Sequence, residues 1–223
     1  MINKLLNETI TIQVREVLEE LNQPVQILLF SSQSNYDYCE SSQILLEEIT
    51  ELSDKVYLDV YDIDRDKDLA ARYKIDKALG FSITRKTDDG SFDYGVRFYG
   101  IPAGYEFNSL IQSILLVASQ KSGLDLKTRD ALGKLKEPIH LQVFATSTGS
   151  YCPQAVLLAY RMALESPWVE AKAVEAAEFP ELAERFNVSG VPQITINHGS
   201  GNVVGAAAEN NLLKQIKQAL NPS

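Results

Sequence analysis

Two cysteines, each at the start of a helix-like segment, carry the clearest chemical signal in this sequence. They are Cys39, in Tyr36-Asp37-Tyr38-Cys39, and Cys152, in Gly149-Ser150-Tyr151-Cys152. Two cysteines separated by two residues at such a place exchange disulfides, with the first acting as the attacking thiolate. Here the first position is Tyr36 in one copy and Gly149 in the other. Each site therefore holds one sulfur, and no disulfide can form within it.

The segments around the two cysteines repeat at a constant offset. Tyr38-Cys39 and Tyr151-Cys152 lie 113 positions apart, and Arg72-Tyr73-Lys74-Ile75 matches Arg185-Phe186-Asn187-Val188 at the same offset. Gly100 and Gly205, 105 positions apart, mark one corner in both copies, because the second hairpin is eight residues shorter. A constant offset across several elements indicates two copies of one fold.

Apolar periodicity predicts the same element order in each copy. The first copy has a helix after Asn7, strands at 25–30 and 56–63, helices at 42–52 and 66–73, a hairpin of 81–84 and 94–99 around 87–90, and a helix at 107–119. The second has helices at 128–135, 153–164, 180–186 and 211–220, and strands at 139–145, 169–176, 193–196 and 202–205. This order predicts an α/β protein in which each copy forms a central mixed sheet flanked by helices. We expect domain 1 to span residues 1–122 and domain 2 residues 123–223.

Composition narrows the function classes. The chain has 223 residues and a net charge of −9, which argues against a nucleic-acid surface. Residues 1–122 account for −8 of that charge, which is typical of a well-solvated surface or of one that steers a basic partner. The start of the chain is too polar for a signal peptide, and no apolar run is long enough to span a membrane. Two cysteines do not make a disulfide framework, so we expect a cytoplasmic protein with no cofactor.

Three stretches carry a resemblance to a known family. They are Ala71-Arg72-Tyr73-Lys74-Ile75-Asp76, residues 95–104 (GVRFYGIPAG) and Thr148-Gly149-Ser150-Tyr151-Cys152-Pro153. With the tandem pairing, they resemble the protein disulfide oxidoreductase (glutaredoxin-like) family, which is built from two contiguous thioredoxin folds. The resemblance covers nearly the whole chain. The N-terminal portion of bacterial peroxiredoxin reductases has the same tandem arrangement.

The resemblance also implies roles for individual positions. Cys39 and Cys152 occupy the place of the second, resolving cysteine, and are the only candidates for catalytic residues. Family members place a proline opposite the motif, usually after a cis peptide bond, and the residue before it offers backbone groups to an extended substrate. Pro192 after Val191 fits this pattern. Leu79 replaces the proline in the first copy, and the cost of a non-proline cis bond predicts a trans Ala78–Leu79 peptide.

Each cysteine also has a plainer interpretation. A buried thiol behaves as a small apolar side chain, and we favour this packing role for both cysteines, more strongly for Cys39. The two motifs of the family do not face each other, so a Cys39–Cys152 disulfide is not expected. His140 and His198 show no metal-ligand spacing, and no metal site is expected.

Two functions of different classes follow. The first is a redox-inactive scaffold that binds an extended polypeptide at Gly149, Ser150, Tyr151, Val191 and Pro192. The second is a single-thiol oxidoreductase in cell redox homeostasis, in which Cys152 forms mixed disulfides with a low-molecular-weight thiol. In both, classical dithiol exchange is lost, and neither requires nucleic acid or a membrane.

Overall fold

The computed structural model describes residues 4–32 and 36–220, and the backbone alone for residues 36–38. The first copy contains α1 (Glu8–Leu18), β1 (Val25–Ser31), α2 (Tyr36–Thr50), β2 (Val56–Asp62), α3 (Lys67–Arg72), β3 (Gly80–Thr87), β4 (Gly90–Phe92), β5 (Val96–Tyr99) and α4 (Tyr105–Ser119). The second contains α5 (Leu126–Leu132), β6 (Ile139–Ala145), α6 (Cys152–Glu165), β7 (Val169–Glu175), α7 (Pro180–Arg185), β8 (Gln193–Ile196), the 3-10 turn η2 (Asn197–Gly199), β9 (Gly201–Val204) and α8 (Glu209–Leu220). We propose the domain boundary in the segment between α4 and α5.

The predicted repeat is visible in the backbone. The β2, α3 and β3 elements begin 113 positions before β7, α7 and β8. The Gly100 N–H donates to the Leu79 carbonyl at 3.1 Å, and the Gly205 N–H donates to the Pro192 carbonyl at 2.7 Å. The corner marked by the two glycines is therefore built the same way in both copies.

The two predicted sheets are continuous in the structure. The strand order is β2-β1-β3-β5-β7-β6-β8-β9, with β4 paired to β3. The junction is a parallel pairing of β5 with β7, in which Val96 lies opposite Ala171 and Tyr99 opposite Val174. One sheet therefore runs through both copies, and β5 of the first copy becomes the direct neighbour of the second.

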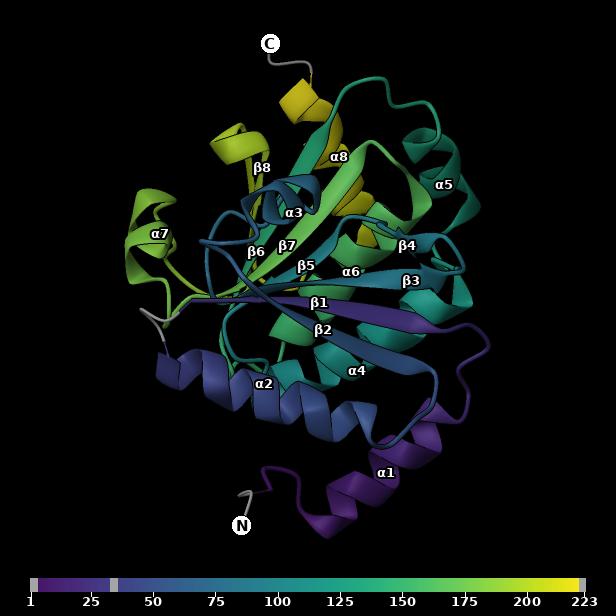
Figure 1. The fold of residues 1–223 in the computed structure, drawn as a ribbon. Helices are drawn as coiled ribbons and strands as arrows, with labels where there is room; N and C mark the ends of the chain where they lie inside the picture. The colour runs from purple at the N-terminus through teal and green to yellow at the C-terminus, as the bar shows by residue number, and fades with distance from the viewer. Residues whose placement is uncertain (1–3, 33–35, 221–223) are drawn as a thin grey trace.

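Helices cover the two faces of this sheet unequally (Figure 1). The larger core lies on one face, where it is built from side chains of the sheet and of the longer helices α1, α2, α4, α6 and α8. On the other face a smaller core forms under the short helices α3 and α7. In the described residues no helix is long and apolar enough to cross a membrane.

Local boundaries depart from the sequence prediction in two places. Helix α2 begins at Tyr36, whereas the prediction began at Ser42, because residues 36–41 show no apolar helical spacing. The predicted turn at Asp88-Asp89 is present, but it joins β3 to the short strand β4. The predicted partner, β5, also pairs with β3, through Gly80, Phe81 and Ser82. The Asn7 cap is confirmed, since its side chain accepts a hydrogen bond from the Ile10 N–H at 2.9 Å.

Candidate functional site

Cys152 is the first residue of α6 and follows the loop at the carboxyl end of β6. A tight turn forms this loop, with the Gly149 N–H donating to the Thr146 carbonyl and the Cys152 N–H donating to the Gly149 carbonyl, both at 3.0 Å. The Cys152 side chain is 0% exposed. Burial raises the pKa of its thiol above the usual value, and contacts with Thr146 offset this only in part. The thiol is therefore protonated and shielded at neutral pH.

Gly149, at the position of the missing first cysteine, packs against this sulfur. A Cβ added to Gly149 would overlap the Cys152 Sγ and would lie 3.2 Å from the Thr146 Oγ1. The sulfur therefore occupies space that a side chain at position 149 would need. Ser150 and Tyr151, by contrast, are exposed, and the Tyr151 side chain is 65% accessible.

The docking loop predicted opposite the motif is present in the second copy. The Val191–Pro192 peptide is cis. The Gln193 side chain holds the preceding loop, accepting from the Ser189 N–H and donating to the Phe186 carbonyl, both at 3.3 Å. Across the described residues, neither the N–H nor the carbonyl of Val191 has a hydrogen-bond partner. Both groups are available to an extended chain.

The first copy closes over the second motif. The Tyr105 N–H, at the start of α4, donates to the Ser147 carbonyl at 2.8 Å. Gly104 has φ +56, and a Cβ there would overlap the same Ser147 carbonyl. The Ile101 N–H donates to the Glu178 carboxylate at 2.8 Å. The segment 101–105 of the first copy therefore forms one wall of the second site.

Glu106, in the first turn of α4, places a buried carboxyl group near Cys152. Its side chain is 0% exposed, and neither carboxylate oxygen has a hydrogen-bond partner among the described residues. Burial raises the pKa of Glu106 to about 7; the nearby Ser109 hydroxyl offsets this in part and the Glu175 carboxylate adds to it. Negative charge on Glu106 or Glu175 in turn raises the pKa of Cys152. The sequence prediction missed Glu106, although an acidic residue one turn before the buried Leu110 was a usable signal.

The first motif lies at the start of α2 and is built differently. Cys39 is 5% exposed, and its Sγ accepts a hydrogen bond from the Ser32 N–H at 3.5 Å. Burial raises its pKa. No carboxylate contributes to that shift, in contrast to Cys152. Tyr36 begins the helix, and its side chain lies outside the described residues.

The prediction of a trans Ala78–Leu79 peptide is wrong, since this bond is cis. The prediction rested on the local preference of a non-proline peptide. The surroundings of Leu79 are those of Pro192: its side chain is buried and its carbonyl accepts from the glycine of the matching corner. The loop geometry of the family position is thus retained in both copies, and only the second carries proline.

The histidines lie together on the face that carries α3 and α7. The rings of His140 and His198 have centroids 5.3 Å apart, and His140 Nδ1 is 3.4 Å from Glu170 Oε2. Within the described residues no group of three potential metal ligands occurs. Cys39 and Cys152 are both unpaired thiols.

Comparison with known proteins places this architecture in a class. Residues 139–218 match the family described as thioredoxin domain. The protein disulfide oxidoreductase of Aeropyrum pernix K1 superposes with a TM-score of 0.86 at 32% identity, over 96% of this chain and 93% of that one. The chain belongs to this thioredoxin-like disulfide oxidoreductase family.

A second group of relatives is longer than this chain. The N-terminal domain of alkyl hydroperoxide reductase AhpF from Enterococcus faecalis superposes with a TM-score of 0.85 at 25% identity, over 95% of this chain and 99% of that one. The full-length alkyl hydroperoxide reductase of this type from Pseudomonas aeruginosa is 27% identical over 201 residues, which is 90% of this chain and 35% of the relative. This chain thus spans about a third of the length of the curated relatives it matches. It is a thioredoxin-like redox protein by relationship to both groups.

Proposed function

We propose that this protein is a polypeptide-binding member of its family in which dithiol–disulfide exchange has been lost. The observation that carries this proposal is the pairing at the second site of Gly149 with a fully buried Cys152. Reversible disulfide exchange within one site needs two sulfurs and an accessible thiolate, and this site has one protonated, shielded thiol. The groups that bind an extended chain, in contrast, are retained.

The proposed binding groove uses backbone pairing. Val191 offers an unpartnered N–H and carbonyl within the described part of the chain, and Tyr151 and Tyr105 present exposed aromatic rings beside α6 and α4. An extended segment can add to such a backbone edge by hydrogen bonds while its side chains contact the flanking rings. The expected partner is therefore an extended polypeptide. A reducing, cytoplasmic setting fits two cysteines that stay unpaired.

The test uses a reduced and alkylated, permanently unfolded polypeptide as the probe. Binding is measured by titration calorimetry, with Val191→Pro removing the N–H donor and Tyr151→Ala removing the exposed ring. We expect each change to weaken binding about tenfold, equivalent to about 1.4 kcal/mol. Tyr57→Ala, which removes a half-exposed tyrosine from β2, is the matched control and should leave affinity unchanged. No binding by the unaltered protein, or equal binding by all variants, would refute the proposal.

The alternative proposal is single-thiol chemistry at Cys152. It is favoured by the location of this thiol at the start of a 14-residue helix, where the helix dipole stabilises negative charge. It is disfavoured by the complete burial of the side chain and by the raised pKa. Reaction of native protein with oxidised glutathione distinguishes the two. The scaffold proposal predicts no adduct until unfolding; a native adduct that disappears in Cys152→Ser would establish the alternative.

A further inference from the structure

On the face opposite the cysteines, a row of polar side chains crosses the junction between the two copies. Arg97 on β5 lies opposite Lys172 on β7, Lys172 lies opposite Gln142 on β6, and Gln142 lies opposite Thr195 on β8. We call Arg97, Lys172, Gln142 and Thr195 the cross-sheet row. The first three present N–H donors to the same side of the sheet. The neighbouring set on this face, Tyr99, Val174 and Phe144, is apolar and buried.

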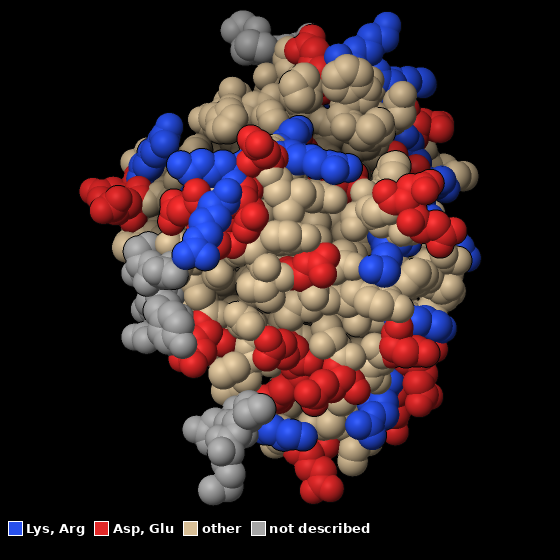
Figure 2. Space-filling model, in the orientation of Figure 1, with Lys and Arg blue, Asp and Glu red and all other residues tan. Residues whose placement is uncertain are grey.

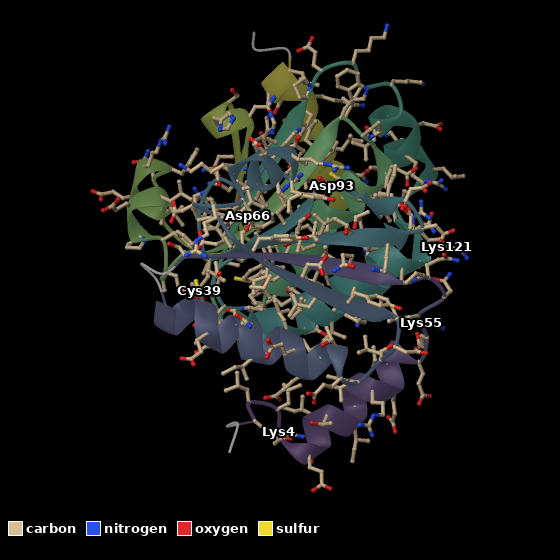
Figure 3. The ribbon with its side chains drawn as sticks, viewed as in Figure 1. Lys4, Cys39, Lys55, Asp66, Asp93 and Lys121 are labelled. Carbon is tan, nitrogen blue, oxygen red and sulfur yellow. The ribbon has the colours of Figure 1, made fainter. Side chains whose placement is uncertain are left out.

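A cleft of about 250 Å³ lies over one end of this row. Besides Lys172, Gln142 and Thr195, it is lined by Lys77, which follows α3, and by Arg185, at the end of α7. The two histidine rings form another side, and Leu182 and Phe186 supply an apolar wall. Figure 2 views this face and shows Lys and Arg side chains gathered in its upper part with acidic side chains between them, whereas acidic side chains predominate below. Figure 3 locates Asp66 and Asp93 on the same side, away from Cys39.

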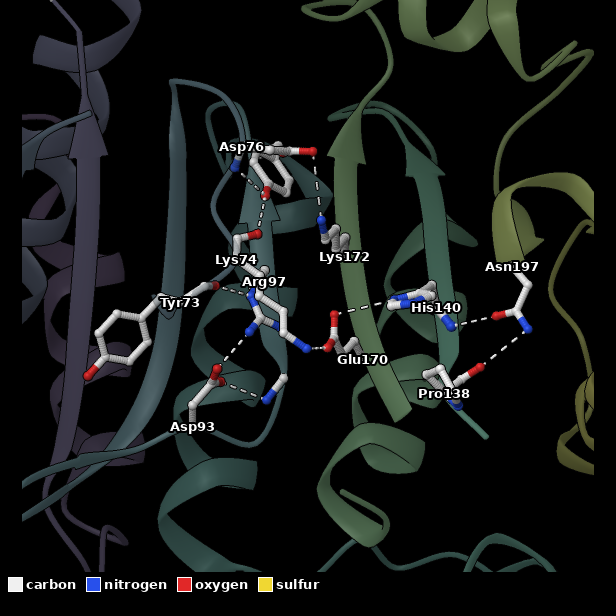
Figure 4. A network of polar contacts seen from close by, with 12 residues as sticks. Tyr73, Lys74, Asp76, Asp93, Arg97, Pro138, His140, Glu170, Lys172 and Asn197 are labelled. Atoms are coloured by element: carbon white, nitrogen blue, oxygen red, sulfur yellow. Dashed lines mark hydrogen bonds and ion pairs between the residues drawn. The ribbon is translucent and has the colours of Figure 1, made fainter. Parts of the chain in front are cut away.

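The carboxylates near the cleft already have cationic partners (Figure 4). Glu170 pairs with Lys74 and lies 3.4 Å from His140. Asp93 accepts from the Arg97 Nη2 at 2.6 Å. Asp76 pairs with Lys77 and lies 3.9 Å from Lys172.

Two donors of the cross-sheet row are left without a partner. The Arg97 Nη1 and the Gln142 Nε2 are buried and make no hydrogen bond within the described residues. Arg97 is 1% exposed, so its unused donor is not turned to bulk water. Buried donors are nearly always satisfied, and one reason for an exception is a missing ligand. Arg97 and Gln142 both lie opposite Lys172, so the two unused donors flank an ammonium group.

The local electrostatic field at the cleft is positive. The pKa values of His140 and Lys172 are both lowered, first by burial. The cations that lower the pKa further are Lys74, Lys172 and Arg97 for His140, and Lys77, Arg97 and Lys74 for Lys172. An added negative charge would relieve this repulsion. In a chain of net charge −9, such a region is the exception.

We propose that this cleft is a binding site for the phosphate group of a small ligand. Lys172, Lys77 and Arg185 supply positive charge, and Arg97 and Gln142 supply the unused donors. Charge-assisted hydrogen bonds of this kind are the strong ones in phosphate recognition. The volume lies just below the roughly 300 Å³ at which pockets for drug-sized ligands begin, so the site suits one phosphate with a small body against Leu182 and Phe186.

The test titrates ¹⁵N-labelled protein with inorganic phosphate and, separately, with phenyl phosphate, at low and constant ionic strength. We expect resonance shifts confined to β5, β6, β7 and α7. Tighter binding of phenyl phosphate would identify an organic phosphate as the ligand, and equal binding would identify the free anion. Sodium chloride at the same ionic strength should produce no such shifts.

Variants locate the site. Lys172→Gln is expected to weaken phosphate binding at least tenfold, and Arg185→Gln, at an exposed position that folding does not depend on, about fivefold. Lys134→Gln, an exposed lysine before β6, is the matched control and should bind normally. Absence of shifts with either phosphate compound would overturn the proposal. So would binding that Arg185→Gln and Lys172→Gln leave intact. The result is independent of polypeptide binding, since the cleft lies on the other face of the sheet.

Discussion

The two half-motifs repeat one sequence pattern but differ in what surrounds them. The second motif lies in the middle of the continuous sheet, where the first copy supplies Gly104, Tyr105 and Glu106 around it. The first motif lies near the outer strands β1 and β2, and among the described residues no charged group of the second copy acts on its cysteine. Equivalent sequence positions therefore have different chemistry because the joining of the sheets gave only one of them a neighbour.

Restoring the missing cysteine is the strongest way to test that difference. Gly149→Cys should recreate a dithiol site next to a retained cis-proline loop, provided that the Cys152 side chain rotates away from the added Cβ. We expect disulfide reductase activity to rise at least tenfold over the unaltered protein, because a thiol at a helix N-terminus is readily ionised. Insulin reduction with dithiothreitol as the electron donor measures it.

Two variants control this experiment. Gly149→Ser adds the Cβ without the sulfur and should be inactive. Tyr36→Cys makes the matching change in the first copy and should give less activity, since Leu79 replaces proline there. Equal activity from both copies would show that the surroundings of the two motifs do not matter.

The next prediction concerns the buried carboxyl group that only the second motif has among the described residues. The pKa of Glu106 is about 7 in the folded protein against 4.5 ordinarily, so the folded state favours the protonated form. Its contribution to stability is complete below pH 4.5 and is lost as the pH rises through 7. Glu106→Gln should therefore raise the free energy of unfolding by about 3 kcal/mol at pH 8 and leave it nearly unchanged near pH 4.

Urea unfolding at a series of pH values measures this effect. Glu16→Gln, on the exposed surface of α1, is the matched control and should show the pH dependence of the unaltered protein. A constant difference between Glu106→Gln and the unaltered protein from pH 4 to pH 8 would contradict the assignment.

A smaller effect is expected where the first copy contacts the second motif. Gly104→Ala adds a Cβ at φ +56 that overlaps the Ser147 carbonyl, and should destabilise the protein by about 2 kcal/mol. Gly133→Ala, whose added Cβ has its nearest neighbour at 3.4 Å, should change stability by less than about 0.5 kcal/mol. Thermal unfolding of both variants provides the comparison. Similar losses would mean that the contact between segment 101–105 and the second motif is unimportant.

The smallest difference separates the two cysteines as packing residues. Cys152 is completely buried and Cys39 is slightly accessible. Cys152→Ala should cost about 1 kcal/mol of stability, and Cys39→Ala less, because a smaller volume of close-packed core is lost. Denaturant unfolding of both variants at one pH compares them. A larger loss from Cys39→Ala would reverse our view of which motif is better packed.

Much of the fold could be predicted from local sequence patterns. The apolar spacing of Val14, Leu18 and Leu21, the alternation in residues 169–175 and the corner glycines gave the element order. Helix α2 was underestimated at its start, where tertiary position and not periodicity sets the helix. The Ala78–Leu79 peptide was predicted wrongly because only local preference was considered. Both errors lie beside the first motif.

The candidate site divides in the same way. Residue identity alone determined that each motif holds one sulfur, that Gly149 and Tyr36 replace the attacking cysteines, and that Pro192 occurs in only one copy. The tertiary structure alone decided that Cys152 lies beside Glu106, that both thiols are protonated, and that Arg97, Lys172 and Gln142 form one row. These facts depend on β5 pairing with β7, which brings together residues about 75 positions apart. Periodicity records which face of an element is buried, but carries no information on which distant element will cover it.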